Sequence, residues 1–512
     1  MEESETLARS GPSRAPSIAP REWRWILVAA GAVTVASAVP YVIAWALTPP
    51  GHVWMGTTHN GVDTAVHWSW IVQARDGSFF LSNLFATEPH SGRFVHLWAW
   101  AIGTTAAALR VSYVVVYHLS RLLFTFTSVV LVYRLAACVV AQTEPRRWAT
   151  AAVAAGSGLG WVVGLSGDPY ASADLVQPEV VTFLALYSSG LFAFSITLFL
   201  LALTSLLEAE RTGRARDAVV AGVALLLLIN VHTYEAVPLA VIWGAHLVIG
   251  RLRHGRFSAR ALRATAIAAA VAAPAAAWMS WYLFADPVFR LRATVPTPSL
   301  PLGHYLLGFG LLIPLAAIGA RTEGARRDMV VLLIAWALLQ LGLGYAPIGL
   351  QRKLLMGVHI PVALLAGLGL ARVRAGRGGW RAAAVVLVLA GSSNVFFTAR
   401  DVHALVVRGG DLSNFRAYVP RETYDGFTRA RETPSTAVIA TTPEYSPHVA
   451  IVAGRTTLPG HWGETPRYPE KQALVRAVLE GRLSLPGFAA ATGATHLLVD
   501  GRLFALRPAR PR

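Results

Sequence analysis

A polar stretch after the first long apolar run carries residue types that could do acid–base chemistry. The stretch HNGVDTAVHWSWIVQARDG, residues 59 to 77, places Asp63 and His67 four residues apart, so both share one face of a helix. Apolar residues at the same spacing form an adjacent stripe. The pattern predicts a short amphipathic helix at a membrane surface, with the acid facing water or a cavity. Alternatively, Trp68 and Trp70 are interface anchors and Asp63 is a solvated cap.

The histidines of the same loop raise the alternative of a divalent metal site. Imidazole and carboxylate groups can ligate zinc or manganese, but the loop has no H-x-x-x-H or H-E-x-x-H pattern. The sequence therefore predicts no defined metal ligands and no certain cofactor, and a bound divalent metal stays an alternative. The residues that could take part are His52, His59, Asp63, His67, His90 and His96.

A second acidic candidate lies in the segment SGDPYASADLVQP, residues 166 to 178. Asp168, Asp174 and the following Glu179 are the acids of this region. Glu179 opens an apolar run, where an acid favours the helix N-terminus. Asp174 is therefore the freer candidate for a catalytic role.

Cationic and histidine side chains occur at the ends of other apolar runs. Arg352 and Lys353 could bind lipid head groups nonspecifically, or could bind one particular phosphate. An arginine that can bond through two nitrogens, beside a lysine, suits a phosphodiester leaving group. In NVHTYEA, residues 230 to 236, His232 and Glu235 are either substrate contacts or satisfied polar residues within a helix bundle.

A Gly- and Pro-rich stretch near the C-terminus gathers further binding candidates. GRTTLPGHWGETP, residues 454 to 466, contains Arg455, His461, Trp462 and Glu464. A tryptophan beside hydrogen-bonding groups suits the face of a sugar, and loops on rigid scaffolds often bind ligands. A plain surface loop is the alternative.

The composition shows what must position these residues. The chain has 512 residues, of which 54% are hydrophobic and 14% charged, against roughly 25% charged in soluble domains. In a soluble protein, the net charge of +17 would suggest a nucleic-acid partner. Here the arginines lie between apolar runs, so membrane topology explains the positive charge. We therefore expect no nucleic-acid partner. The single Cys138 excludes an intrachain disulfide framework. Abundant alanine and arginine are typical of a high-GC bacterial source.

Twelve apolar runs follow one another along the chain, and the positive-inside rule decides which of them span. If the weak run 94–109 lies in the interface instead of crossing, every strongly basic loop is cytoplasmic. We therefore expect an all-α polytopic membrane protein with about eleven transmembrane helices. The cytoplasmic tail is 1–24, the membrane domain is 25–397, and its extracytoplasmic loop 48–112 carries interfacial helices. The segments 166–178 and 285–302 and the C-terminal region also lie outside.

The C-terminal region from 398 to 512 differs in character from the rest. TAVIATT (436–442) and THLLVD (495–500) predict strands, with a helix near 469–481 between them. This pattern indicates a small extracytoplasmic α/β domain. It contains no Gly-rich phosphate loop before a helix.

The arrangement resembles the GT-C superfamily of membrane glycosyltransferases, which includes the protein mannosyltransferases and the lipid A aminoarabinose transferases. The likeness rests on a cytoplasmic N-terminus, one span, and a long outer loop with an early acid, Asp63, followed by a helix with Arg121 and Leu122. The blocks that resemble uncharacterised bacterial members are GSGLGW, DLVQPEVVTF, QRKLLMGVHIPVALLAGLGLAR and GHWGETP.

The resemblance implies an enzyme that transfers a hexosyl or pentosyl group from a polyprenyl-phosphate donor to an envelope glycan, lipid or protein acceptor at the outer face of the membrane. It also implies that Asp63 is the general base and that Arg352 and Lys353 neutralise the phosphate. The first-loop acid of such enzymes is commonly one of a pair, whereas Thr64 follows Asp63. A non-catalytic protein of this architecture is therefore one alternative. A transporter of lipid-linked glycans is another, but apart from Arg134 the spans nearly lack the ionisable residues that it would need.

Overall fold

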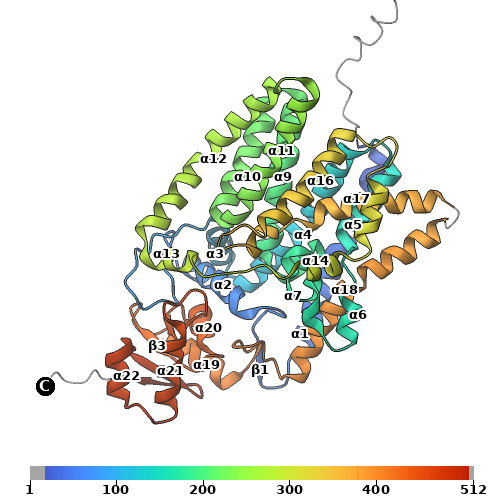
Figure 1. The fold of residues 1–512 in the computed structure, drawn as a ribbon. Coiled ribbons are helices and arrows are strands. Elements are labelled where there is room, and N and C mark those ends of the chain that lie inside the picture. The colour runs from blue at the N-terminus through green and yellow to red at the C-terminus, as the bar shows by residue number, and fades with distance from the viewer. Residues whose placement is uncertain (1–17, 377–378, 507–512) are drawn as a thin grey trace, which may run out of the picture.

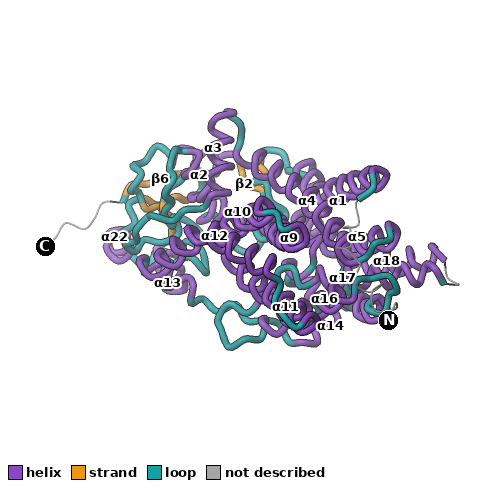
Figure 2. Tube along the Cα trace, turned by 90° about the horizontal axis from the view of Figure 1, so that it is seen from above, coloured by secondary structure: helices purple, strands orange, loops and turns teal. Residues whose placement is uncertain are grey.

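A bundle of long helices and a smaller α/β region make up the protein (Figure 1). The computed structural model describes residues 18–376 and 379–506. The C-terminal α/β region lies at one end of the helical bundle, next to the helices of the first long loop, and Figure 2 shows the same arrangement from above. Strands are few and short, so the fold class is mostly helical, as expected.

Within the described residues, eight helices or helix pairs are long and apolar enough to cross a membrane, which makes the chain a multi-pass membrane protein. Five of them are single helices: α1 (Pro20–Ala46), α4 (Tyr113–Val139), α9 (Gly190–Thr212), α12 (Ala259–Ala285) and α18 (Gly379–Val407). The other three join a longer and a shorter helix: α5 (Thr143–Ala155) with α6 (Gly160–Leu165), η4 (Thr233–Glu235) with α11 (Ala236–His254), and η5 (Arg352–Leu355) with α17 (His359–Ala375).

Three further segments match the remaining apolar runs. Helices α14 (Leu302–Phe309) and α15 (Leu312–Gly319) form one bent pair, with an angle of 71° between them. Helices α10 (Ala215–Val231) and α16 (Arg327–Leu343) have 17 residues each and pack within the bundle. Counting all three would make eleven spans. That number and the cytoplasmic position of the N-terminus stay predictions.

Short helices connect these segments on the side of the α/β region. The first long loop holds β1 (His52–Trp54), α2 (Gly61–Arg75) and α3 (Leu97–Leu109). The connections further along the chain hold η2 (Pro169–Ala171), α7 (Ala173–Val176), η3 (Pro178–Val180), α8 (Thr182–Ser188) and α13 (Pro287–Ala293). Helix α3, with 13 residues, is about 20 Å long, too short to cross a membrane, which supports the interfacial interpretation of the run 94–109.

Glycines let the central helix α17 approach its two neighbours closely. A Cβ atom added at Gly319 of α15 would lie 1.8 Å from the carbonyl oxygen of Leu365. A Cβ atom added at Gly367 of α17 would lie 2.3 Å from the Cα of Ala149 on α5. In a membrane the hydrophobic effect does not drive helices together, so their association depends on dispersion contacts. Small residues favour these contacts because they let two helix backbones approach closely.

Ionisable side chains inside the membrane helices are more numerous than the sequence suggested. Glu22 of α1 and Arg146 of α5 form a buried ion pair at 3.0 Å. Arg121 of α4 is also buried, where it donates to the hydroxyl of Ser37 at 3.2 Å and lies over the ring of Tyr41. Arg121 lies within an expected span and departs from the expectation that the spans nearly lack such groups apart from Arg134, whereas Glu22 lies in the tail 1–24 and Arg146 in a loop between two apolar runs. These groups are paired within the bundle, as buried charges require.

Helix α2 is covered by protein on both sides and is not an exposed amphipathic helix. It packs against α3 and α4 on one side and against the α/β region on the other, and ten of its fifteen residues are buried. Trp68 is 0% exposed and Trp70 is 6% exposed, so neither tryptophan is an interface anchor. Amphipathic spacing shows which face is apolar, but a second layer of protein covers the polar face here.

The α2–α3 contact depends on Gly103, and its substitution provides a test of the fold. A Cβ atom at this position would lie 2.5 Å from the carbonyl oxygen of Ile71 and 2.6 Å from the amide nitrogen of Arg75. We expect Gly103→Ala to separate the helices and to cost about 1–3 kcal/mol, seen as a lower thermal unfolding midpoint in detergent. Gly31→Ala is the matched control, because a Cβ atom at this position in α1 has nothing within 4 Å. Equal midpoints for both variants would contradict this packing.

The C-terminal region contains the predicted strands and helix. A four-stranded sheet has the order β4 (Thr456–Leu458), β3 (Val438–Ala440), β5 (His496–Val499), β6 (Arg502–Ala505), with β3 parallel to β4 and β5, and β6 antiparallel to β5. The helices around it are α19 (Arg421–Ala430), α20 (Ser446–His448), the π-helical turn η6 (Val449–Ala453), α21 (Tyr468–Leu479) and α22 (Leu485–Thr492).

Two features tie this region to the membrane part. Strand β1 of the first loop pairs antiparallel with β2 (Tyr418–Pro420), with Val53 opposite Val419. Helix α18 continues without a break past residue 397, where we expected the boundary, and ends at Val407. The first long loop and the C-terminal region therefore form one packed unit around α2.

Candidate functional site

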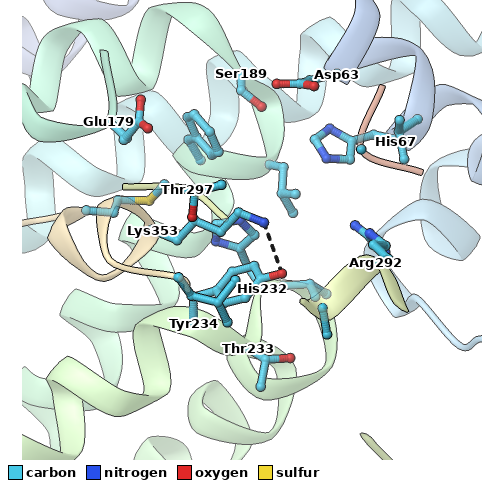
Figure 3. A pocket seen from close by; sticks show the side chains of 18 of the residues that line it. Asp63, His67, Glu179, Ser189, His232, Thr233, Tyr234, Arg292, Thr297 and Lys353 are labelled. Atoms are coloured by element: carbon cyan, nitrogen blue, oxygen red, sulfur yellow. Dashed lines mark hydrogen bonds between the residues drawn. The ribbon is translucent and has the colours of Figure 1, made fainter. Parts of the chain in front are cut away.

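A cavity of about 850 Å³ lies where α2, the C-terminal loop and several membrane helices meet. Its lining comes from α2, the start of α9, the α10–α11 junction, α12, α13, the segment before α17 and the loop between β4 and α21. Figure 3 shows side chains from α2, the α10–α11 junction, α13 and the segment before α17 around this cavity. Polar residues gather in two groups, which we call the carboxylate end (Asp63, His67, Arg292, His461, Trp462, Glu464) and the cationic end (His232, Tyr234, Arg352, Lys353).

Asp63 stands near the start of α2, where both of its carboxylate oxygens accept hydrogen bonds. The amide of Asn60 donates to Oδ2 at 2.6 Å, and Nε2 of His461 donates to Oδ1 at 2.8 Å. The side chain of Asp63 is 41% exposed, and because it lines the cavity, its open surface faces that cavity. Asp63 is thus a carboxylate that two hydrogen bonds hold in place, and it can contact a molecule bound in the cavity.

The hydrogen bonds of His461 define which of its nitrogens carries a proton. Its Nδ1 accepts from the backbone N–H of Gly463 at 3.0 Å, so this nitrogen has no proton to donate. The proton of the neutral ring must therefore be on Nε2, which faces Asp63. The ring is 4% exposed and is held at both nitrogens. His461 is therefore oriented to donate to Asp63.

Opposing influences determine the charge state of the carboxylate end. Burial by itself would raise the pKa of Asp63, but the hydrogen bonds from His461 and Asn60 hold this pKa below its usual value. The pKa of His67 is lowered to about 3, mainly by burial and also by the neighbouring His96, while Asp63 opposes the shift. At neutral pH this end therefore contains an ionised carboxylate and a neutral imidazole.

Arg292 is a cavity residue that the sequence analysis missed. Its Nε lies 2.5 Å from a carboxylate oxygen of Glu464, and its guanidinium lies 5.5 Å from the ring centre of Trp70. The pair joins α13 to the C-terminal loop across the cavity. One signal was available, because Arg290 and Arg292 lie in a loop expected outside, where arginine is disfavoured.

The two cations at the other end differ in their partners. Arg352 lies 3.1 Å from a carboxylate oxygen of Glu179, which also lines the cavity. Lys353 donates to the hydroxyl of Tyr234 at 3.2 Å and lies 4.5 Å from the centre of that ring (Figure 3). Among the described residues, Lys353 forms no ion pair with an acid within 4.0 Å. Its charge is therefore available to an anionic ligand.

Several polar groups around the cavity lack partners within the described part of the chain. Nδ1 of His67 and the hydroxyl of Ser189 are buried and make no hydrogen bond there, and both residues line the cavity. His232 is held by Glu235, with Nδ1 and the carboxylate oxygen 2.6 Å apart. Buried polar atoms nearly always have partners. Both atoms are enclosed by the protein, so they face the cavity wall without being open to it.

The remaining wall of the cavity is apolar and is built by membrane helices. Its residues come from α11, from α12 and from the segment before α17. They include Val237, Ala240, Val241, Ala276, Met279, Leu283, Ile348 and Leu350. Such a wall next to charged groups suits a ligand with an apolar chain and a polar head.

Two predicted site residues lie outside this cavity. Asp174 is 0% exposed and accepts hydrogen bonds from Ser172 and from the backbone N–H groups of Gly158 and Gly160. It stabilises a turn between helices, while Glu179, which we had set aside, lines the cavity. Of the two acids, Glu179 is therefore the one that can reach a bound molecule. The expectation that Asp174 is free for a catalytic role was wrong, because the spacing of residues does not show contacts with backbone N–H groups.

Arg455 also has a structural position. Its guanidinium donates to backbone carbonyl oxygens, including those of Thr433 at 2.6 Å and Ala453 at 3.2 Å. It does not line the cavity, unlike the other three candidates of its stretch. The stretch 454–466 is therefore not a plain surface loop, but only three of its four candidate residues can contact a ligand in the cavity.

The histidines of the first loop are dispersed. His59, His67 and His96 line the cavity, whereas His52 and His90 do not. His59 lies 3.1 Å from Asp401, and His96 caps α3. In residues 18–376 and 379–506, no group of three or more His, Cys, Asp or Glu side chains is placed to hold a metal ion. The structure therefore adds no support to the metal alternative.

The fold itself has clear counterparts among solved structures. No protein-family model matches the chain, and no curated protein matches it. The fold is that of the GT-C membrane glycosyltransferases, as the resemblance in the sequence suggested.

Three solved structures illustrate the likeness. The arabinofuranosyltransferase AftD from Mycobacteria matches 94% of this chain with a TM-score of 0.55 and 18% identity. This chain spans only 35% of the length of AftD. The second is the archaeal oligosaccharyltransferase AglB from Archaeoglobus fulgidus, in complex with an inhibitory peptide and a dolichol-phosphate. The match covers 94% of this chain and 70% of AglB, with a TM-score of 0.53 and 13% identity. The third is ArnT from Cupriavidus metallidurans, bound to undecaprenyl phosphate. The match covers 88% of this chain and 88% of ArnT, with a TM-score of 0.50 and 12% identity.

Proposed function

We propose that this protein transfers a sugar from a polyprenyl-phosphate donor to an acceptor hydroxyl. The observation that carries the proposal is one cavity that joins a held carboxylate, Asp63, to a lysine without an acidic partner, Lys353, along an apolar wall. A donor of this class has matching parts, namely a sugar, a phosphate and a long apolar tail. The GT-C fold and the polyprenyl phosphates bound to AglB and ArnT support the same class of donor.

In the proposed reaction, the acceptor oxygen attacks the anomeric carbon and its proton passes to Asp63. The bond between the anomeric carbon and the phosphate oxygen breaks, and its electron pair leaves with the polyprenyl phosphate. Lys353 stabilises the charge of the leaving phosphate, with Arg352 and His232 near it. A bound donor and acceptor would displace water from the cavity, which strengthens both interactions. The proposal places the reaction at the outer face of the membrane.

Reconstitution tests this function directly. The full-length protein in lipid nanodiscs would be incubated with polyprenyl-phosphate-linked hexoses and pentoses and with an extract of envelope glycans. Mass spectrometry would follow the release of polyprenyl phosphate and the gain of one sugar by an acceptor. Absence of both products with every donor, together with no binding of undecaprenyl phosphate, would reject the proposal.

His461 provides a test of how Asp63 is held. We expect His461→Gln to lower the transfer rate about tenfold, because a glutamine in this place does not reproduce the oriented Nε2–H donor. The pKa of Asp63 is held down by His461, so the variant should raise it. The base must be ionised, and activity should therefore be lost at a higher pH than in the native protein as the pH is lowered.

The measurement is the pH profile of transfer in both proteins. His52→Gln is the control, because His52 is exposed and lies outside the cavity. An acid limb at the same pH in His461→Gln and in the native protein would show that His461 does not position the base.

A further inference from the structure

Trp462 is a large aromatic side chain that is only half covered by the protein. It lines the cavity beside His461, with the two ring centres 5.5 Å apart, and it is 50% exposed. A tryptophan exposed to this extent leaves much apolar surface in contact with water, which costs free energy unless a ligand covers it. The position of Trp462 at the carboxylate end suggests such a ligand.

The loop around Trp462 is held firmly on both sides. The side-chain amide of Asn83 donates to the carbonyl oxygen of Glu464 at 2.9 Å. The hydroxyl of Thr465 donates to the carbonyl oxygen of Phe85 at 2.6 Å. Together with the bond from His461 to Asp63, these contacts fix the loop against the first outer loop. Trp462 therefore stands on a rigid support close to the carboxylate.

The charges nearby indicate what kind of molecule fits. Asp63 and Glu464 are carboxylates, and the one cation at this end, Arg292, is already paired with Glu464. An anionic acceptor would be repelled by Asp63 and would have to break that pair. The ion pair itself carries carboxylate acceptors and guanidinium donors, and both residues line the cavity, which suits hydroxyl groups.

We propose that Trp462 and the Arg292–Glu464 pair form a subsite for an uncharged carbohydrate acceptor. The flat indole covers the C–H face of a sugar ring, and the ion pair contacts its hydroxyl groups. This inference rests on the proposed function, since it names the class of acceptor that delivers a hydroxyl to Asp63. A peptide or a phosphorylated acceptor does not fit these charges equally well.

An array of immobilised oligosaccharides tests the proposal with the full-length protein in detergent. The array would carry neutral, uronate-containing and phosphorylated sugars, together with peptides. We expect neutral sugars to bind, Trp462→Ala to weaken their binding about tenfold, and Trp462→Phe to retain most of it. Trp380→Ala is the matched control, since this tryptophan of α18 is 64% exposed but lies outside the cavity.

Three results would overturn the subsite. They are no binding of neutral sugars at millimolar concentration, a preference for acidic sugars or peptides, and native binding by Trp462→Ala. Binding of undecaprenyl phosphate, measured by native mass spectrometry, should be the same in Trp462→Ala and in the native protein. If undecaprenyl phosphate does not bind but neutral sugars bind through Trp462, the donor proposal fails while the carbohydrate subsite stands.

Discussion

Asp63→Asn is expected to lower the rate of sugar transfer by about 10²–10⁴-fold, the usual contribution of a general base. The asparagine has nearly the same size and its oxygen can still accept from one of the two donors, Asn60 or His461, but it cannot accept the proton of the acceptor hydroxyl. Because Asp63 lies at the carboxylate end, away from Lys353, the affinity for undecaprenyl phosphate should be unchanged. Transfer is measured by mass spectrometry in nanodiscs, and donor affinity by native mass spectrometry.

Asp76→Asn is the matched control for this experiment. Asp76 is the C-cap of the same helix α2, and it pairs with Arg75 and Arg431 outside the cavity. The control should transfer sugar at the native rate. If Asp63→Asn keeps native activity, Asp63 is not the base. If the native protein shows no transfer but binds the donor, the non-catalytic alternative is favoured.

Lys353→Gln is expected to weaken the binding of undecaprenyl phosphate about 10–100-fold, since a hydrogen bond to a charged group contributes about 1.5–3 kcal/mol. Lys353 has no acidic partner within 4.0 Å among the described residues, so the phosphate is free to take its charge. The native affinity should also fall as salt is added, and the variant should lose part of this dependence.

Two neighbouring substitutions make the test specific. Arg352→Gln should have the smaller effect, because Arg352 is already paired with Glu179. Lys353→Arg preserves the charge and should retain part of the affinity. If Arg352→Gln weakens binding more than Lys353→Gln does, the phosphate is held mainly by the arginine, and the assignment to Lys353 is wrong.

Local patterns predicted much of the architecture. The apolar runs became long helices, because a segment in a membrane must satisfy its backbone hydrogen bonds within itself. The strands at 438–440 and 496–499 and the helix at 468–479 were also visible in the sequence. Asp63 and His67 share a helix and line one cavity, as their spacing suggested. Each of these features depends on neighbours close in the chain.

The errors have a common physical origin in contacts between distant segments. The amphipathic pattern of α2 revealed its apolar stripe but not the C-terminal region that covers its other side. Asp174 looked free because its partners are backbone N–H groups at residues 158 and 160, which no residue pattern displays. Arg121 looked like part of a motif, and only the packing shows that it is a buried cation over Tyr41.

The sequence by itself determined that this is a multi-pass helical membrane protein with an α/β C-terminal region, because hydrophobic thickness and helix periodicity act over short stretches of chain. The tertiary structure alone decided what the cavity contains. His461 meets Asp63 across 398 residues, and Glu464 meets Arg292 across the same cavity. Such pairs form only when the packing of whole segments brings them together, so no local pattern can reveal them.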